Sequence, residues 1–205
     1  MSRARTRIGV LISGSGTNLQ ALLDRAADGT IPGEVALVLS NKEDAHGLER
    51  ARKAGAPTAV VRHKDFPTRE AFDARLVEAL RGARVDLVCL AGFMRVLTPA
   101  FIRAFEGRIL NIHPALLPAF PGVHAQKQAF DYGVRWTGAT VHFVDEGTDT
   151  GPIVLQAAVP VLPEDDLERL SARILAEEHR IYPEAVRLFC EGRLRIEGRK
   201  VRILE

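Results

Sequence analysis

Residues 11–20 read LISGSGTNLQ and follow a short apolar run near the start of the chain. The apolar run predicts a strand, the glycines and serines predict a turn, and the residues from Thr17 onward predict a helix. This order is typical of a phosphate-binding loop, in which amides at the start of the helix face an anion. The stretch therefore leaves three ligands to distinguish: a dinucleotide cofactor, a nucleoside triphosphate, or a single phosphate on a small substrate.

The details of this loop narrow the choice of ligand. A dinucleotide fingerprint needs a third glycine, but Leu19 stands at that position. It also needs an acidic residue at the end of the second strand, which here ends in Ser40 and Asn41. A Walker loop needs a lysine, and this loop has none. A single phosphate or carboxylate remains, with the alternative that Thr17 and Gln20 form a capping box that only stabilises the helix.

The alternation of strand and helix continues through the first half of the chain. Strands are expected at residues 8–12, 35–39, 58–61, 85–90 and 108–112, and helices near residues 18–27, 46–54, 68–81 and 98–105. Short aliphatic strands separated by amphipathic helices indicate βαβ units. We therefore expect an α/β fold of Rossmann type, with a mostly parallel twisted sheet and helices on both faces.

The second half has a different pattern. The proline-rich stretch HPALLPAFPGVHA predicts a loop, and TGATVHFVDEGTDTGPIVLQAAVPV predicts two antiparallel strands joined by a turn. A long helix is expected from about residue 165 to 191, with a kink at Pro183 and a stop at Gly192. The tail RLRIEGRKVRILE predicts a small hairpin. We expect residues 1–205 to form a single domain.

Composition limits the classes of partner. The 205 residues are 46% hydrophobic and 26% charged, with a formal net charge of +2, which gives no electrostatic case for binding nucleic acid. The basic cluster in the first seven residues precedes too short an apolar run for a signal peptide. No apolar segment approaches the roughly 20 residues of a membrane span. We therefore expect a cytoplasmic protein that binds neither nucleic acid nor a membrane.

The two cysteines do not indicate chemistry. Cys89 and Cys190 each lie in an apolar pattern and are expected to be buried free thiols. No Cys/His pair has the spacing of metal ligands, so no metal is expected.

The strongest chemical signal is ILNIHPALLP at the end of the fifth expected strand. Asn111 and His113 are two residues apart, so the pleat places both side chains on one face. Pro114 favours an extended backbone at His113. Ligands of open α/β sheets bind at the carboxyl ends of the strands. His113 is therefore either a catalytic group or a histidine that only makes structural hydrogen bonds.

Two carboxylates are further candidates. Asp149 lies in the turn DEGTDTGP, where it either caps its own backbone or serves function. An Asp149 that reaches His113 would favour the imidazolium and raise its pKa. Glu178 falls on the apolar stripe of the long helix, so it is either paired in a ligand pocket or exposed at the rim of the stripe.

The segment CLAGFMRVLTP follows the fourth expected strand and is unusually apolar for a loop. Its side chains either fill the core or form the wall of a pocket for a flat aromatic ligand. Of the remaining histidines, His142 and His179 are expected to serve structure or solvent, and the role of His124 stays open.

The motifs SGSGTNLQ, SNKEDAHGLERA, AGFMRVL, NIHPALLPAFPG, TGATVHFV and DTGPIVLQ, with EHRIYPEAV, together resemble the phosphoribosylglycinamide formyltransferase family from about residue 7 to 195. The resemblance implies transfer of the formyl group of 10-formyltetrahydrofolate to the amino group of glycinamide ribonucleotide, in purine biosynthesis. It implies small-molecule substrates, no metal, and a monomer or homodimer.

The resemblance also implies a role for individual residues. The catalytic residues are Asn111, His113 and Asp149, with Asn111 and a protonated His113 donating hydrogen bonds to the developing oxyanion. The substrate phosphate and ribose are held by Gly16, Thr17, Asn18, Leu19, Gln20 and Glu178. The folate is held by Arg69, Met94, Arg95, Val96, Leu97 and Asn111. The chain departs from the family at Ala115 and Gln126, so His124 receives no role by analogy.

Four other functions remain as alternatives. A methionyl-tRNA formyltransferase would carry an additional basic C-terminal domain, and a formyltetrahydrofolate hydrolase an N-terminal regulatory domain; we expect neither here. A non-catalytic nucleotide- or folate-binding module would leave Asn111, His113 and Asp149 without a role. An NAD-dependent oxidoreductase is disfavoured by Leu19 and by the polar tip of the second strand.

Overall fold

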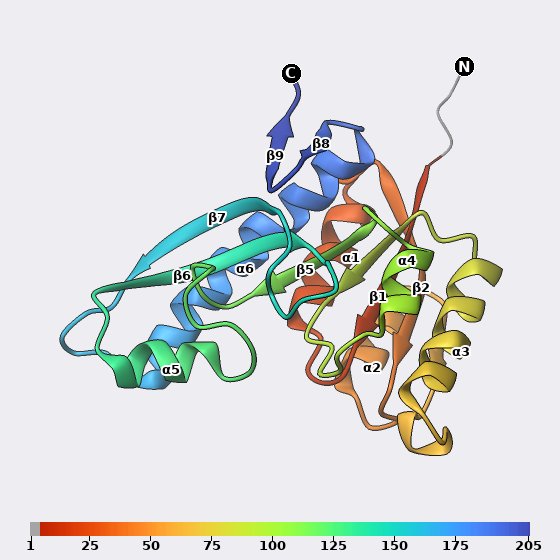
Figure 1. Ribbon diagram of the computed structural model, residues 1–205, viewed down its shortest axis with the longest axis horizontal. Coiled ribbons are helices and arrows are strands. Elements are labelled where there is room, and N and C mark those ends of the chain that lie inside the picture. Colours follow the sequence, from red (N-terminus) through yellow and green to blue (C-terminus); the bar gives the residue numbers. More distant parts are fainter. Residues whose placement is uncertain (1–4) are drawn as a thin grey trace.

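A nine-stranded sheet runs through the described residues 5–205 of the computed structural model, in the order β3-β2-β1-β4-β5-β6-β7-β9-β8 (Figure 1). The strands are β1 (Thr6–Ile12), β2 (Gly33–Ser40), β3 (Thr58–Val60), β4 (Leu87–Leu90), β5 (Ile109–His113), β6 (Trp136–Phe143), β7 (Ile153–Pro160), β8 (Leu194–Glu197) and β9 (Lys200–Ile203). The first part of the N-terminal basic cluster lies outside the described residues.

The direction of the strands changes at β5. Strands β1 to β5 are mutually parallel, whereas β5 with β6 and β6 with β7 are antiparallel. Strands β8 and β9 form an antiparallel hairpin, which joins the sheet through a parallel pairing of β9 with β7. The predicted mostly parallel sheet, antiparallel excursion and terminal hairpin are confirmed.

Helices cover both faces of the sheet, as predicted. They are α1 (Thr17–Ala27), α2 (His46–Lys53), α3 (Arg69–Gly82), α4 (Pro99–Ala104), α5 (Ala125–Tyr132) and α6 (Leu167–Cys190), with a 3-10 turn, η1 (His63–Asp65). Residues of β1 alternate between two cores, because successive side chains of a strand point to opposite faces. Val10 and Ile12 pack with α1, α2 and α6, whereas Leu11 packs with α3 and α4.

Helix α6 crosses the face of the sheet formed by β5, β6 and β7 (Figure 1). Asp166 caps its first turn by accepting from the Arg169 amide at 2.8 Å. The helix continues through Pro183 as one element and ends before Gly192, whose φ of 71° suits glycine and whose amide donates to Phe189. The predicted stop is therefore confirmed.

Helix α5 was not predicted from the sequence. The proline-rich loop ends at His124, which precedes the first helical residue with a φ of 59°. Only Ala125 and Ala129 of this helix are buried, so its apolar periodicity is too weak to signal a helix. His124 therefore lies where the expected loop passes into a helix.

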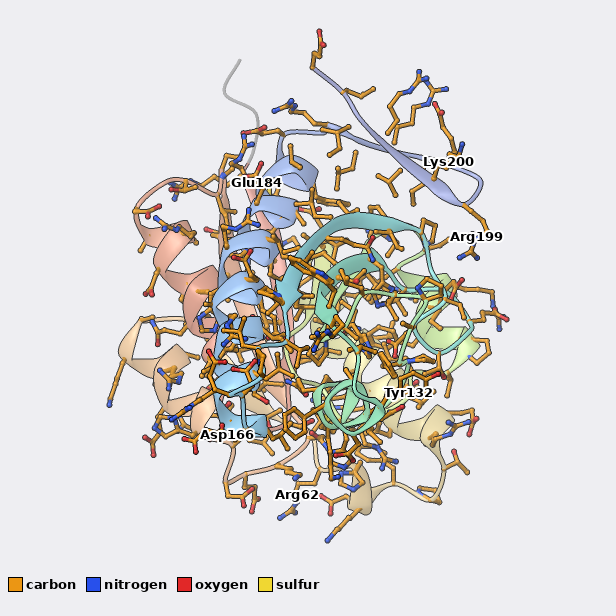
Figure 2. The ribbon with its side chains drawn as sticks, turned by 90° about the vertical axis from the view of Figure 1, so that its left-hand side faces the viewer. Arg62, Tyr132, Asp166, Glu184, Arg199 and Lys200 are labelled. Atoms are coloured by element: carbon orange, nitrogen blue, oxygen red, sulfur yellow. The ribbon has the colours of Figure 1, made fainter. Side chains whose placement is uncertain are left out.

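The two edges of the sheet differ in form. Strand β3 has three residues, and the hairpin at the other edge carries charged side chains that include Arg195, Glu197 and Arg202. Figure 2 shows Arg199 and Lys200 at the turn of this hairpin, away from the sheet centre. Within the described residues, no helix has the length and apolar character needed to cross a membrane.

Candidate active site

Strand β5 carries the central side chains of the site to the carboxyl end of the parallel strands. Asn111 and His113 lie on the same face, and the antiparallel register places His142 of β6 opposite Asn111. Leu90 at the end of β4 pairs with Asn111, so the segment after β4 begins next to the site. Asp149 enters from the turn between β6 and β7.

The three residues predicted to be catalytic come together in the structure. Nδ1 of His113 lies 3.3 Å from Oδ2 of Asp149, and Nδ2 of Asn111 donates to Oδ1 of the same carboxylate at 3.5 Å. His113 is almost fully buried, and Asp149 is mostly buried. One carboxylate therefore contacts both an amide and an imidazole.

His142 is a fourth member that the sequence reasoning missed. Its Nε2 accepts from Nδ2 of Asn111 at 3.1 Å and lies 3.6 Å from Oδ1 of Asp149. Its Nδ1 donates to the carbonyl of Phe143 at 2.9 Å, which fixes the tautomer. The usable signal was the antiparallel pairing of the two strands, which brings His142 opposite Asn111.

Asp145, not Asp149, makes the side-chain hydrogen bonds within the turn between β6 and β7. Oδ1 of Asp145 accepts from the Gly147 amide at 3.1 Å and from the Thr150 hydroxyl at 2.6 Å. Asp149 instead accepts from the amide of Gly122 at 2.7 Å, across from its own turn. The alternative that Asp149 only caps its own backbone is therefore wrong.

Burial and charge act in opposite directions on the pKa of His113. Both ring nitrogens face oxygen acceptors, because Nε2 donates to the carbonyl of Phe120 at 2.8 Å and Nδ1 faces Asp149. Burial nevertheless lowers the pKa of His113 by more than Asp149 and Phe120 raise it. The expectation of a raised pKa is corrected for this reason.

The pKa of Asp149 is lowered despite its burial. Burial alone would raise the pKa of this carboxyl, but the neighbouring His142, the hydrogen bond from the Gly122 amide and the charge of His113 lower it by more. The site therefore combines an ionised aspartate with a histidine whose charged form is costly at rest.

The start of α1 has the form of an anion cradle. The residue before the helix is Gly16, with a φ of 71° and no side-chain cap, and the first helical bond runs from the Gln20 amide to the Gly16 carbonyl. The amides of Thr17, Asn18 and Leu19 precede that bond and point out of the helix. The capping-box alternative is wrong, because the backbone turns into the helix at Gly16 rather than at Thr17, and the Gln20 side chain donates to Asp24.

Glu178 of α6 faces this cradle from within the protein. Its Oε2 accepts from Nδ2 of Asn18 at 2.6 Å, and the residue is only 5% exposed. Burial raises the pKa of Glu178, and the bond from Asn18 offsets part of that change. Glu178 is therefore paired beside the cradle, and the alternative of rim exposure is wrong.

A surface cavity extends from the cradle along α1. It is lined by Thr17, Gln20, Ala21, Asp24, Arg25, Arg50 and His179. Arg50 also donates from Nε to the carbonyl of Ser15 at 2.9 Å. Burial, and then the charge of Arg50, lower the pKa of His179. The cavity thus has the guanidinium groups of Arg25 and Arg50, together with the Asp24 carboxylate, next to the amides of the cradle.

The segment after β4 is divided between core and surface. Met94 and Val96 are 66% and 62% exposed, whereas Leu97 is buried in the core against α3 and α4. Arg95 is half-buried. Arg69, the first residue of α3, is exposed one turn before Asp73, whose carboxylate accepts from the Thr98 amide at 2.6 Å. Met94 and Val96 thus present an apolar surface in the segment that follows β4, the strand that pairs with β5.

Cys89 and Cys190 are buried and free, as expected. Burial raises the pKa of Cys190 to about 11. Among residues 5–205, no group of three or more His, Cys, Asp or Glu side chains is placed to hold a metal ion.

Comparison with known proteins relates this geometry to a family. The family described as Formyl transferase matches residues 6–186. The phosphoribosylglycinamide formyltransferase of Haemophilus influenzae is 48% identical over 191 residues, which are 93% of this chain and 90% of that protein. The crystal structure of glycinamide ribonucleotide transformylase 1 from Symbiobacterium toebii has a TM-score of 0.97 and 63% identity, covering 98% of this chain and 95% of that one.

A larger relative contains a similar region. The trifunctional purine biosynthetic protein adenosine-3 of Drosophila pseudoobscura pseudoobscura is 54% identical over 197 residues, which are 95% of this chain. The chain spans 14% of the length of that relative.

Proposed function

This chain belongs to the formyl transferase family, and on that premise we propose that it transfers the formyl group of 10-formyltetrahydrofolate to the amino group of glycinamide ribonucleotide. The products are formylglycinamide ribonucleotide and tetrahydrofolate, in purine biosynthesis. The observation that carries the proposal is the convergence of His113 and Asn111 on Asp149, at 3.3 Å and 3.5 Å, in a sheet that also presents an anion cradle after β1 and an exposed apolar segment after β4.

Each of the two substrates has a matching surface near these three residues. The amides of residues 17–19 suit the phosphate of glycinamide ribonucleotide, and Glu178 and Asn18 suit its ribose hydroxyls. The apolar surface of Met94 and Val96 suits the flat pterin ring of the folate. Arg69 suits the carboxylate tail of the folate.

The chemistry requires an acyl transfer between two nitrogens. The substrate amine forms a bond to the formyl carbon, and the carbonyl electrons move onto the formyl oxygen. Nδ2 of Asn111 donates to this oxyanion; one such preorganised donor contributes about 3–4 kcal/mol in comparable acyl transfers. The bond between the formyl carbon and N10 of the folate then breaks.

One proton moves from the attacking amine to N10 during this exchange. We assign its transfer to His113, directly or through a water. When the substrate replaces the Phe120 carbonyl as partner of Nε2, the ring proton lies on Nδ1 toward Asp149, so Nε2 accepts the amine proton and passes it to N10. Asp149 stabilises the imidazolium as it forms, which compensates for the burial that lowers the resting pKa of His113. The amine loses one proton and N10 gains one, so the reaction needs no external acid or base.

A turnover assay tests the proposal. We expect purified protein to convert the two substrates into formylated product and tetrahydrofolate in equal amounts. Release of formate without glycinamide ribonucleotide would indicate a hydrolase instead. Binding of both ligands with no turnover would indicate a non-catalytic module and overturn the proposal.

Substitution of the central residues tests the assigned mechanism. We expect His113→Ala and Asp149→Ala each to lower kcat by about 10²–10⁴-fold, with a much smaller effect on KM. Asp44→Ala, which removes an exposed carboxylate outside the site, serves as control. Wild-type rates in either site variant would contradict the mechanism.

We further propose that residues 1–205 act as one catalytic domain in the cytoplasm, as a monomer or homodimer. The family match over residues 6–186 supports the single catalytic domain. Sedimentation of the purified protein, with and without substrates, distinguishes the two assemblies.

A further inference from the structure

Ser13 lies at the junction between the two proposed substrate-binding segments. It directly precedes the glycine-rich turn at the start of α1 and is 3% exposed. Its amide donates to the carbonyl of Gly92 at 3.1 Å, and its hydroxyl accepts from the amide of Met94 at 2.8 Å. One residue therefore holds the backbone that leads into the proposed folate-binding segment.

The orientation of the Ser13 hydroxyl is set by Asn41. Because the hydroxyl oxygen accepts from Met94, its hydrogen is available to Oδ1 of Asn41, which lies at 2.6 Å. Nδ2 of Asn41 in turn faces Nδ1 of His63 at 3.2 Å, so that nitrogen accepts and the ring proton is on Nε2. A continuous chain of hydrogen bonds thus runs from the Met94 amide to the 3-10 turn after β3.

The position of Asn41 indicates that this chain of hydrogen bonds orders the backbone at Met94. It is 3% exposed at the carboxyl end of β2, two strands away from β4 in the sheet order. Burying a serine and an asparagine costs desolvation that two aliphatic residues would avoid. The hydrogen bonds of Ser13 and Asn41 offset this desolvation only when the Ser13 hydroxyl accepts from Met94 and donates to Asn41. That arrangement fixes the backbone at Met94.

We propose that Asn41 is a positioning residue for the formyl donor, acting through the Ser13 hydroxyl on the amide of Met94. The inference rests on the proposed function for the role of residues 94–97 as a folate-binding segment. The side-chain hydrogen bonds of Ser13 and Asn41 join Met94 and His63 and do not reach Asn111, His113 or Asp149. Breaking these hydrogen bonds therefore raises KM for the folate, while kcat is retained.

A double-mutant cycle tests the proposal. The variants are Ser13→Ala, Asn41→Leu and the two combined, with Ser13→Thr to restore the hydroxyl. We expect each single variant to raise KM for the formyl folate about fivefold to twentyfold, with kcat within about twofold of wild type. Because Asn41 acts through Ser13, the combined variant should be no worse than Ser13→Ala. Ser13→Thr should recover most of the loss.

Ser40→Ala is the matched control. Ser40 is as buried as Asn41, and its hydroxyl donates to the carbonyl of Lys42 at 2.7 Å within the same turn. We expect it to lower the melting temperature without changing KM for the folate. An equal rise in KM in this control, additive losses in the double variant, or an unchanged KM in Asn41→Leu would each overturn the proposal.

Amide hydrogen exchange separates this inference from the proposed function. The amide of Met94 should lose protection in Ser13→Ala and Asn41→Leu, while the amides of β2 keep theirs. This readout needs no turnover, so it tests the chain of hydrogen bonds even where no formyl transfer is found. If Ser13→Ala does not fold, Asn41→Leu carries the same test, and unchanged protection at Met94 would overturn the inference.

Discussion

At the scale of single residues, His113 combines two opposing influences on one imidazole. Asp149 and the Phe120 carbonyl favour the charged ring, and burial disfavours it more strongly. The ring is therefore neutral at rest and becomes charged at lower cost when an oxyanion develops beside it. Such a group can accept a proton and return it within one reaction cycle.

The lowered pKa of His113 predicts a pH dependence of stability. The unfolded chain binds the His113 proton near pH 6.5, and the folded protein binds it only at lower pH. The free energy of unfolding should therefore fall as pH decreases from about 6.5 through the folded pKa. Urea unfolding between pH 8 and 5 should show a shallower loss in His113→Gln. His179 contributes in the same direction in both proteins, so an identical slope would contradict the prediction.

Residues differ in how far the sequence alone predicted them. The shared face of Asn111 and His113 follows from the two-residue period of a strand, which holds in any sheet. The contact of His142 depends on the register of β5 with β6, which the intervening loop and helix α5 determine. The sign of the His113 pKa depends on burial, which no local motif contains.

At the scale of elements, the entry into α1 depends on the backbone of Gly16. A Cβ at this position would lie 2.5 Å from Cα of Gly47 in α2, and the φ of 71° is unfavourable for other residues. We expect Gly16→Ala to reduce the free energy of unfolding by at least about 1 kcal/mol and to raise KM for glycinamide ribonucleotide. Gly14→Ala is the control, because a Cβ there meets nothing within 4 Å. Equal effects in both variants would contradict the prediction.

Helix α6 is fastened to the sheet by Tyr182. Its buried hydroxyl lies 2.9 Å from the carbonyl of Leu90 and 3.1 Å from that of Leu110, on neighbouring strands. We expect Tyr182→Phe to lower the free energy of unfolding by about 1–3 kcal/mol, because these buried carbonyls lose a donor. Urea unfolding of the variant gives the measurement. An unchanged midpoint would show that the carbonyls are satisfied without Tyr182.

Helices and strands were predicted correctly where their apolar periodicity is strong. Helix α6 and the parallel strands have long or fully apolar patterns, so their types were recognised and their ends were placed within a few residues. The capping box failed because Thr17 and Gln20 have the right spacing but the turn begins at Gly16. Helix α5 failed because two buried alanines give little periodicity.

At the scale of the whole molecule, the site is assembled from distant parts of the chain. The cradle comes from the start of α1, the central pair from β5, and the remaining groups from the turn after β6 and from α6. The βαβ order predicted the layers and the end of the sheet at which these parts meet. It did not predict side-chain contacts between Asn18 and Glu178, which are 160 residues apart.

The same architecture predicts a gradient of local stability. Strands β1 and β4 lie inside the sheet, whereas the terminal hairpin joins it through the pairing of Ile153 with Lys200 and a bond from Arg199 to Thr150 at 3.0 Å. Amide hydrogen exchange should therefore be slowest in β1 and β4 and fastest in β8 and β9. Exchange from the hairpin as slow as that from β1 would contradict this expectation.

The two dissimilar edges of the sheet have a consequence for how copies of the protein meet. An open sheet edge offers unpaired amides and carbonyls to any other strand, and long apolar edges promote aggregation. Here β3 offers only three residues, and β8 has Arg195 and Glu197 among its four. Edge-to-edge addition of further strands is thereby disfavoured. The nine-stranded sheet is therefore a poor template for the strands of other copies.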